Sequence, residues 1–311
     1  MIHVKSPGLF TTVQDLGRNG FGPLGVSASG AADPVALHVG NRLAGNPKTC
    51  AALEMTLVGG SFIFSRQSVV AITGSDFGAT LDGGPVPGWT AFEIGAGQTL
   101  AFGPTRTGAR CYLCLRGGID VPRFLGSAST HILTGLGGFE GRALRKGDTL
   151  AVGDSSSEIR LRSVAPAMLS KLLPRGSLRV TAGPQDDWFT ETARAAFYTE
   201  AYRVTEESNR MGLRLEGPPV LQTRMEQMIT EPVALGAIQV PGGGQPIILF
   251  VEQQTTGGYP KIANVIAADL ARVGQLRPRD EIRFEWVTHS EARRLICAQQ
   301  ELLESEALFL P

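Results

Sequence analysis

Short apolar runs alternate with turns rich in glycine and proline along most of the chain. Between Ser61 and Val152 the successive runs are SFIF, SVVAITG, ATLDGGPVP, TAFEIG, QTLAFG, RCYLCLRGG and DTLAVG. Runs of this length bounded by turn residues are typical of β-strands. Within ATLDGGPVP, Asp82 and Gly83 suit the two-residue turn of a hairpin. The first half of the chain is therefore expected to form a β-barrel or sandwich.

Helices are few in this pattern, and each has its own boundary signals. The first is expected to be capped by Asp33, to have Pro34 in its first position and to end before Gly45. Its apolar positions share one face, so it should pack against a sheet. Further helices are expected in APAMLSKLL, from Asp186 or Asp187, after a cap at Asn264, and from about Ser290 to Leu303.

The stretch from Gly236 to Lys261 combines a core hairpin with a polar end. Two β-rich runs, 237–240 and 247–251, flank a Pro/Gly loop, and the second is apolar throughout, as in a strand covered on both faces. Residues 252–256 are all polar, and two glycines follow them. Polar groups at the mouth of a buried strand predict a candidate site.

A short pattern recurs in AGQTLAFG, KGDTLAVG and PRDEIRFEW, in which a polar turn leads into a strand with alternating apolar residues. It suggests that the second half repeats the architecture of the first. A chain of 311 residues also exceeds the size at which one core stops growing. We expect two domains, 1–165 and 166–311, with the linker between Gly153 and Gly176.

Composition and charge exclude several classes of protein. The 29 basic and 29 acidic residues cancel, so a nucleic-acid partner is not expected. No apolar run approaches the ~18 residues of a membrane helix, and no signal-peptide pattern opens the chain. We expect a cytoplasmic protein without a membrane partner.

Metal and nucleotide motifs are missing. The four histidines lack the spacing of metal ligands. Cys111 and Cys114 lie on a predicted strand, where residues three apart face opposite sides, so a structural role is favoured for both. No metal site is expected. No GxxxxGK[ST] loop, biotin-accepting Met-Lys-Met or GxSxG elbow is present. For Ser27 and Ser29 a turn or capping role is favoured over catalysis.

Several segments together resemble one family over nearly the whole chain. They are LFTTVQDLGRNGFGPLGVSASGAADP, ALEMTL, ITGSDFGATLDGGPVP, RGGIDVPRFLGSAST, SNRMGLRLEGPP, GAIQVPGGGQPIILF and QTTGGYPKIANVIAADL. In this order they resemble the allophanate hydrolase subunit 2 family, also described as the C-type carboxyltransferase subunit of 5-oxoprolinase, which includes the antagonist of the kinase inhibitor Kip.

The resemblance implies a mainly β protein with two cyclophilin-like β-barrel domains and a few short flanking helices. It implies a subunit of an ATP-dependent 5-oxoprolinase, which converts 5-oxoproline to glutamate together with a subunit 1 type (Kip inhibitor-like) partner and a third subunit. ATP would act at the level of the complex, with no cofactor bound covalently to this chain. One alternative is a carboxyltransferase module acting on urea or a related amide, with biotin carried by a partner. Another is a non-catalytic regulator that binds a histidine-kinase inhibitor.

The matched motifs also supply candidate site residues. The catalytic candidates are Glu54, Asp76, Arg210 and Tyr259. The substrate-binding candidates are Asp15, Arg18, Ser29, Ser127, Ser129, Asn209, Gln239, Gln254, Thr255 and Thr256. Arg210 could clamp a carboxylate or carbonyl, or form a turn-stabilising surface ion pair. Glu54 and Asp76 could act as acid or base, or lie at exposed strand ends.

The sequence departs from the family pattern in two places. Ala128 stands where the loop motif has arginine, and Glu252 and Gln253 precede the QTTGGYP motif. Loss of a cation from a loop that meets an anionic group would change the substrate or the activity.

Overall fold

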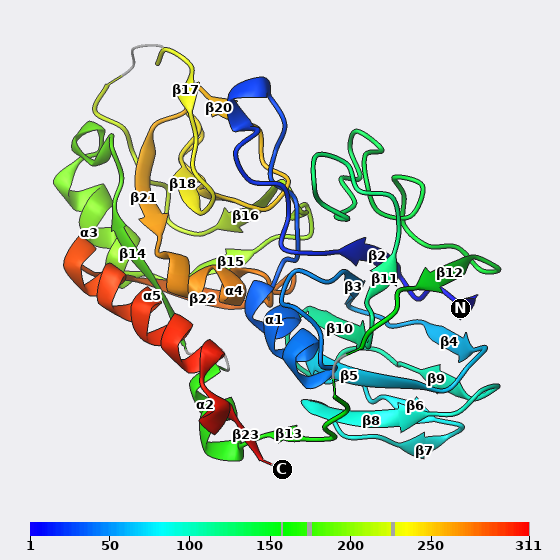
Figure 1. Cartoon of the computed structure of the whole chain (residues 1–311). Coiled ribbons are helices and arrows are strands. Elements are labelled where there is room, and N and C mark those ends of the chain that lie inside the picture. The colour runs from blue at the N-terminus through cyan, green and yellow to red at the C-terminus, as the bar shows by residue number, and fades with distance from the viewer. Residues whose placement is uncertain (157, 173–175, 225–227, 311) are drawn as a thin grey trace. The chain divides into compact units, whose positions relative to one another are not determined.

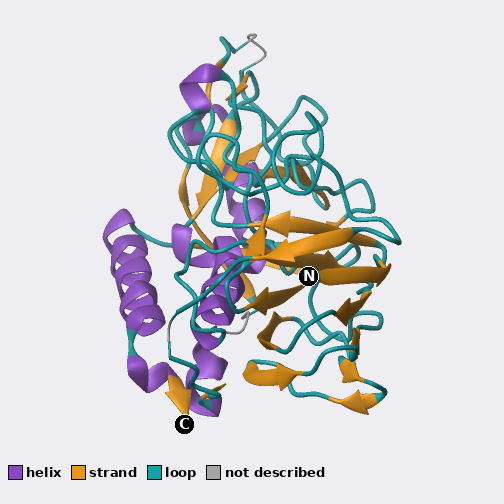
Figure 2. Cartoon of the chain, turned by 45° about the vertical axis from the view of Figure 1, so that its right-hand side comes forward, coloured by secondary structure: helices purple, strands orange, loops and turns teal. Residues whose placement is uncertain are grey.

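Strands make up most of the regular structure of this protein (Figure 2). The computed structural model describes residues 1–156, 158–172, 176–224 and 228–310. The chain divides into unit 1, with Met1–Arg18, Ser29–Leu173 and Leu302–Pro311, and unit 2, with Asn19–Ala28 and Pro174–Glu301. Each unit thus joins segments distant in sequence, whereas the predicted domains, 1–165 and 166–311, are continuous.

Unit 1 contains two seven-stranded sheets. The first has the order β11 (Ile119–Asp120), β12 (Thr149–Val152), β1 (Ile2–Ser6), β4 (Ser61–Phe64), β9 (Thr99–Ala101), β6 (Thr80–Leu81) and β7 (Gly84–Pro85). The second has the order β2 (Phe10–Gln14), β3 (Ala52–Thr56), β10 (Arg110–Leu115), β5 (Ser68–Gly74), β8 (Thr90–Ile94), β13 (Ser163–Val164) and β23 (Phe309–Leu310). Every run predicted between Ser61 and Val152 contains a strand.

The two sheets of unit 1 share one apolar core. Phe62 and Leu100 come from the first sheet, Leu53 and Leu113 from the second, and all four are fully buried in one cluster. Alternate residues of each strand face this cluster, which is the arrangement of a β-sandwich. The mainly β prediction is confirmed.

Helix α1 (Pro34–Leu43) covers the outer face of the second sheet, against β5 and β10 (Figure 1). Asp33 caps it as predicted, because its side chain accepts a hydrogen bond from the backbone N–H of Ala36. Gly40 lets the helix approach closely, since a Cβ there would lie 2.5 Å from Sγ of Cys114. Cys111 belongs to the core on the other face of β10, so the two cysteines point apart, as their spacing predicts.

Unit 2 is built on a closed barrel. Its strand order is β14 (Ser177–Ala182), β21 (Lys261–Val265), β18 (Ala237–Gln239), β19 (Ile247–Leu249), β16 (Gly212–Glu216), β15 (Tyr202–Val204) and β22 (Glu281–Trp286). The pairing of β18 with β19 confirms the predicted core hairpin. A separate short pair joins β17 (Glu231–Pro232) to β20 (Thr256–Gly257).

The remaining helices correct two predictions. They are α2 (Pro166–Leu172), α3 (Glu191–Thr199), α4 (Leu270–Val273) and α5 (His289–Glu304), with 3-10 turns η1 (Gly22–Leu24), η2 (Asp186–Trp188), η3 (Ala267–Asp269) and η4 (Glu306–Leu308). At Asp186, where a helix from Asp186 or Asp187 was expected, the chain forms the 3-10 turn η2, and the α-helix begins at Glu191, because Thr190 provides the cap. Asn264 is not a cap; it lies inside β21, and α4 follows from η3.

The recurring polar turn has the same geometry at its three positions. Gly97, Gly147 and Arg279 occupy equivalent places and have φ of 82°, 92° and 75°. In each turn the side chain of the next residue accepts a hydrogen bond from the backbone N–H that opens the turn. Arg279 is the single non-glycine of the three, and a side chain at positive φ is strained.

Replacing Arg279 by glycine should therefore stabilise unit 2 relative to replacing it by alanine. Both variants lose the exposed Arg279–Glu206 ion pair, so the comparison isolates the backbone. We expect Arg279→Gly to be about 1 kcal/mol more stable than Arg279→Ala in urea unfolding. At the exposed strand position Glu281 the order should reverse, because glycine weakens an ordinary strand. Equal stability of the two Arg279 variants would contradict the assignment of strain.

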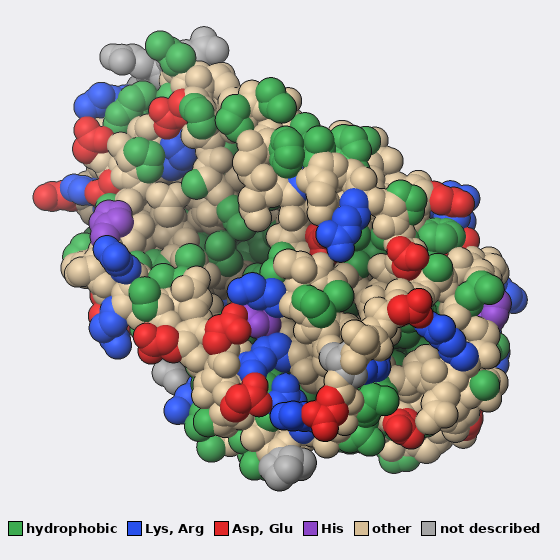
Figure 3. All heavy atoms as spheres, viewed as in Figure 1, with side chains coloured by type: hydrophobic (Ala, Val, Ile, Leu, Met, Phe, Trp, Pro, Cys, Tyr) green, Lys and Arg blue, Asp and Glu red, His purple; other side chains and the backbone are tan. Residues whose placement is uncertain are grey.

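Charged side chains of both signs are interspersed on the face seen in Figure 3, with no large area of one sign. This distribution agrees with the balanced composition. Within the described residues, no helix is long and apolar enough to cross a membrane.

Candidate functional site

In unit 1 the carboxylate of Asp15 forms hydrogen bonds that connect two motifs distant from each other in the sequence. Oδ1 accepts hydrogen bonds of 2.6 Å from the hydroxyls of both Ser127 and Ser129 and one of 2.8 Å from the N–H of Gly17. Oδ2 accepts one of 2.7 Å from the N–H of Ala128. A carboxylate that accepts four hydrogen bonds has used all its acceptor positions. Asp15 therefore acts as a staple, a side chain that holds the 127–129 loop in place through these hydrogen bonds.

Arg18 and Ser29 extend the same network. The Arg18 guanidinium is buried, donates to the carbonyl of Ser129 and lies 5.6 Å from the ring centre of Phe124. The hydroxyl of Ser29 donates to the carbonyl of Thr130 at 2.7 Å. Five substrate-binding candidates from two motifs are thus brought together. Ala128, the departure from the family motif, is also buried here, and its methyl group belongs to the apolar core.

Glu54 lies in the middle of β3 and is 1% exposed, so the prediction of an exposed strand end is wrong for it. Its Oε2 accepts hydrogen bonds from the N–H of Ala32 at 2.8 Å and from the hydroxyl of Tyr112 at 2.7 Å. Burial, then the charge of Glu54, raises the pKa of Tyr112 well above its usual value. The neutral phenol in turn accepts from the N–H of Asp33, which fixes the start of α1.

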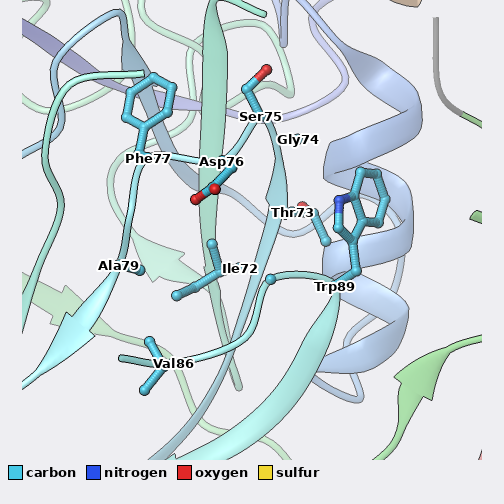
Figure 4. Close-up of a pocket in the computed structure, with 10 residues that line it drawn as sticks. Ile72, Thr73, Gly74, Ser75, Asp76, Phe77, Ala79, Val86 and Trp89 are labelled. Atoms are coloured by element: carbon cyan, nitrogen blue, oxygen red, sulfur yellow. The ribbon is translucent and has the colours of Figure 1, made fainter. Parts of the chain in front are cut away.

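Asp76 is exposed, just beyond the end of β5, as one interpretation of its position predicts. Its carboxylate accepts a hydrogen bond of 2.7 Å from the N–H of Gly78 and lies 3.2 Å from the guanidinium of Arg106. It also lines a pocket of about 190 Å³ in unit 1 (Figure 4).

In unit 2 Arg210 pairs with Glu252, and the pair is buried instead of lying on the surface. The side-chain exposures are 8% and 2%, so each charge depends on the other. Asn209 forms the adjacent turn, since its Oδ1 accepts a hydrogen bond of 2.8 Å from the N–H of Met211. Glu252, the second departure from the family pattern, therefore serves to neutralise Arg210.

Gln239 carries a buried donor with no hydrogen-bond partner among the described residues. It is 1% exposed; its Oε1 accepts from the amide of Gln254 at 3.2 Å, while its Nε2 is unsatisfied. A register shift in the β18–β21 pair occurs at Gln239, and such bulges re-aim side chains. Gly257 covers the amide closely, because a Cβ there would lie 2.4 Å from Nε2.

Lys261 faces Gln239 across this pair and completes a polar cluster that sequence reasoning missed. Its ammonium lies 2.5 Å from Oε1 of Glu231, and the same oxygen accepts from the amide of Gln185 at 2.9 Å. The hydrogen bonds from Lys261 and then Gln185 lower the pKa of Glu231, so this carboxylate remains ionised at neutral pH. We call Gln185, Glu231, Gln239, Gln254 and Lys261 the barrel-end cluster.

The other candidates of the QTTGGYP motif lie in the chain segment next to this cluster. The carbonyl of Thr255 accepts from the N–H of Val233, and Thr256 lies in β20, opposite Pro232. Tyr259 is 50% exposed. No group of three or more His, Cys, Asp or Glu side chains within the described ranges could hold a metal ion.

The chain thus combines a two-sheet sandwich in unit 1 with a closed barrel in unit 2, and each unit contains a buried polar cluster. The family model "Carboxyltransferase domain, subdomain A and B" matches residues 24–286. The chain belongs to this family.

Its relatives include a 5-oxoprolinase subunit and a urea amidolyase. It is 37% identical to the C-type subunit of the 5-oxoprolinase of Escherichia coli (strain K12), over 99% of this chain and 98% of that protein. It is 35% identical to the urea amidolyase of Saccharomyces cerevisiae, over 98% of this chain and 18% of that protein. Among solved structures, the urea carboxylase of Kluyveromyces lactis matches with a TM-score of 0.90 and 33% identity, over all of this chain and 30% of that one. TTHA0988 matches with a TM-score of 0.79 and 34% identity, over 91% and 55%.

Proposed function

We propose that this protein is the C-type subunit of an ATP-dependent 5-oxoprolinase and acts on its lactam substrate only in complex with a subunit 1 type partner and a third subunit. The observation that carries the proposal is the similarity to the C-type 5-oxoprolinase subunit of Escherichia coli along 98% of its length. The urea amidolyases match over a small fraction of their length, and their remaining parts have no counterpart in this chain.

The barrel-end cluster supports an amide or lactam as the substrate. Opening a lactam places negative charge on its carbonyl oxygen, and fixed N–H donors stabilise that charge. Lys261 supplies a cation held in place by Glu231, and Nε2 of Gln239 supplies a donor that no described residue uses. Both groups are buried in this chain, so in this role they reach the carbonyl oxygen only in the assembled complex, and Gln185 holds Glu231 in position.

ATP is assigned to the complex as a whole, because the sequence contains no phosphate-binding loop. The contribution of this chain is then to orient the planar amide and stabilise charge on its oxygen. Partners complete the site with the groups that handle the nucleotide.

Reconstitution tests the proposal. The chain is mixed with its subunit 1 type partner and the third subunit, and release of glutamate and phosphate is measured with ATP and 5-oxoproline. We expect turnover in the complete mixture and none when any component is omitted. Carboxylation of urea with a biotin-carrying partner, without lactam opening, would replace the proposal by the carboxyltransferase alternative. Tight binding to the subunit 1 type partner without turnover of either substrate would favour the regulator.

A further inference from the structure

The pocket beside Asp76 exists because two strands of unit 1 separate. The antiparallel ladder of β5 and β8 ends at the pair Ile72–Thr90, two residues before β5 itself ends at Gly74. At Trp89, where φ is 56°, the segment that leads into β8 bends away from β5. The N–H of Trp89 still donates a hydrogen bond of 2.6 Å to the carbonyl of Ile72. Within the described residues, no strand pairs with β5 on this side beyond Ile72.

The gap is lined by apolar side chains, by the hydroxyl residues Thr73 and Ser75 and by one ionisable group, Asp76. Figure 4 shows the Asp76 carboxylate between the ring of Phe77 on one side and the indole of Trp89 on the other, with Ile72 and Val86 below it. The pocket therefore offers a carboxylate and aromatic side chains.

The charge of Asp76 is available to a ligand. Its partner Arg106 is 68% exposed and Asp76 is 55% exposed, and such surface pairs contribute only about 0–1 kcal/mol. A carboxylate has about four acceptor positions, and the Gly78 and Arg106 contacts use two. A metal ion does not suit a site with a single carboxylate. An ammonium group on a short alkyl chain suits it, since it donates to oxygen, interacts with indole and buries its carbons.

We propose that this pocket binds a small primary ammonium cation, with the ammonium on Asp76 and the alkyl chain against Ile72, Val86 and Trp89. This function goes beyond the proposed lactam chemistry, uses none of the barrel-end cluster and is independent of it. A volume of about 190 Å³ is smaller than that of the usual drug-sized site, which suits a short alkyl chain.

Butylammonium is the probe, with butanol and butyrate as neutral and anionic controls of similar size. Calorimetry on the wild-type chain measures all three, and Trp89 fluorescence in the Trp188→Phe/Trp286→Phe variant places the site. We expect butylammonium to bind with a Kd of about 1–10 mM, a weak affinity suited to one ion pair and a short chain. Butanol should bind at least about tenfold more weakly. Equal binding of butanol, or no binding of butylammonium up to 100 times that Kd, would overturn the proposal.

Two substitutions test whether the pocket binds a cation or an anion. Asp76→Asn keeps an oxygen for the Gly78 N–H but removes the charge, and should weaken butylammonium binding at least about tenfold. Arg106→Gln removes the competing cation, and should tighten it up to about fivefold. Loss of binding in Arg106→Gln together with binding of butyrate would instead identify an anion pocket. Since neither residue belongs to the barrel-end cluster, lactam turnover in the complex can fail while this binding persists, and the reverse.

Discussion

Replacing Lys261 by methionine should reduce lactam turnover by the reconstituted complex about 10²–10³-fold, the usual effect of removing one donor to a developing oxyanion. Methionine has similar length and no charge, so it fills the buried space that the lysine stem occupies. Turnover is measured as glutamate release at saturating ATP, with subunit association checked on the same sample. Retention of activity within threefold would exclude Lys261 from the site.

Stability and titration separate this role from a purely structural one. Glu231 keeps the hydrogen bond from Gln185 and its side chain is 39% exposed, so the unfolding free energy should change by no more than about 1 kcal/mol. Because Lys261 is the largest cause of the lowered pKa of Glu231, that pKa should rise in the variant, which carboxyl NMR titration detects. Lys48→Met is the matched control, since it also removes a lysine from a glutamate pair, that with Glu304, and should leave turnover unchanged.

Local chemistry explains which parts of the fold could be predicted. Asp82–Gly83 and Asp33–Pro34 specify their turn and cap through their own backbone preferences, and both form as expected. The cap at Thr190 was missed because Asp186 and Thr190 are both good caps, and the sequence alone does not choose between them. The order of the strands in the sheets could not be predicted from the sequence, because β23 joins a sheet whose other strands precede it by more than a hundred residues.

The candidate sites show the same limit. Motif resemblance named Asp15, Ser127 and Ser129, but the contacts between them span 112 and 114 residues and exist only in the fold. Lys261 was missed because a lone lysine in a strand normally faces solvent. The register shift at Gln239 and the counter-charge of Glu231 make its burial possible, and neither is visible in the sequence.

Asp15→Ala should destabilise unit 1 by about 3–5 kcal/mol, because removing one member of a buried charged network leaves its partners unpaired. The hydroxyls of Ser127 and Ser129 and the N–H group of Ala128 would lose their acceptor while still shielded from water, and the half-buried N–H of Gly17 would lose its acceptor as well. Ser127→Ala removes one donor and leaves the carboxylate three others, so it should cost only about 1 kcal/mol.

The unfolding of unit 1 is followed in urea through Trp89 fluorescence, in the variant where phenylalanine replaces Trp188 and Trp286 of unit 2. Asp76→Ala is the matched control, an exposed carboxylate of the same unit whose loss should change stability by less than about 0.5 kcal/mol. The alternative role of Asp15 in substrate binding makes the opposite prediction. If Asp15→Ala unfolds at the wild-type midpoint but abolishes lactam turnover, the four hydrogen bonds serve a binding site. If stability falls and the residual folded complex keeps its turnover, Asp15 is a staple that holds the 127–129 loop on β2.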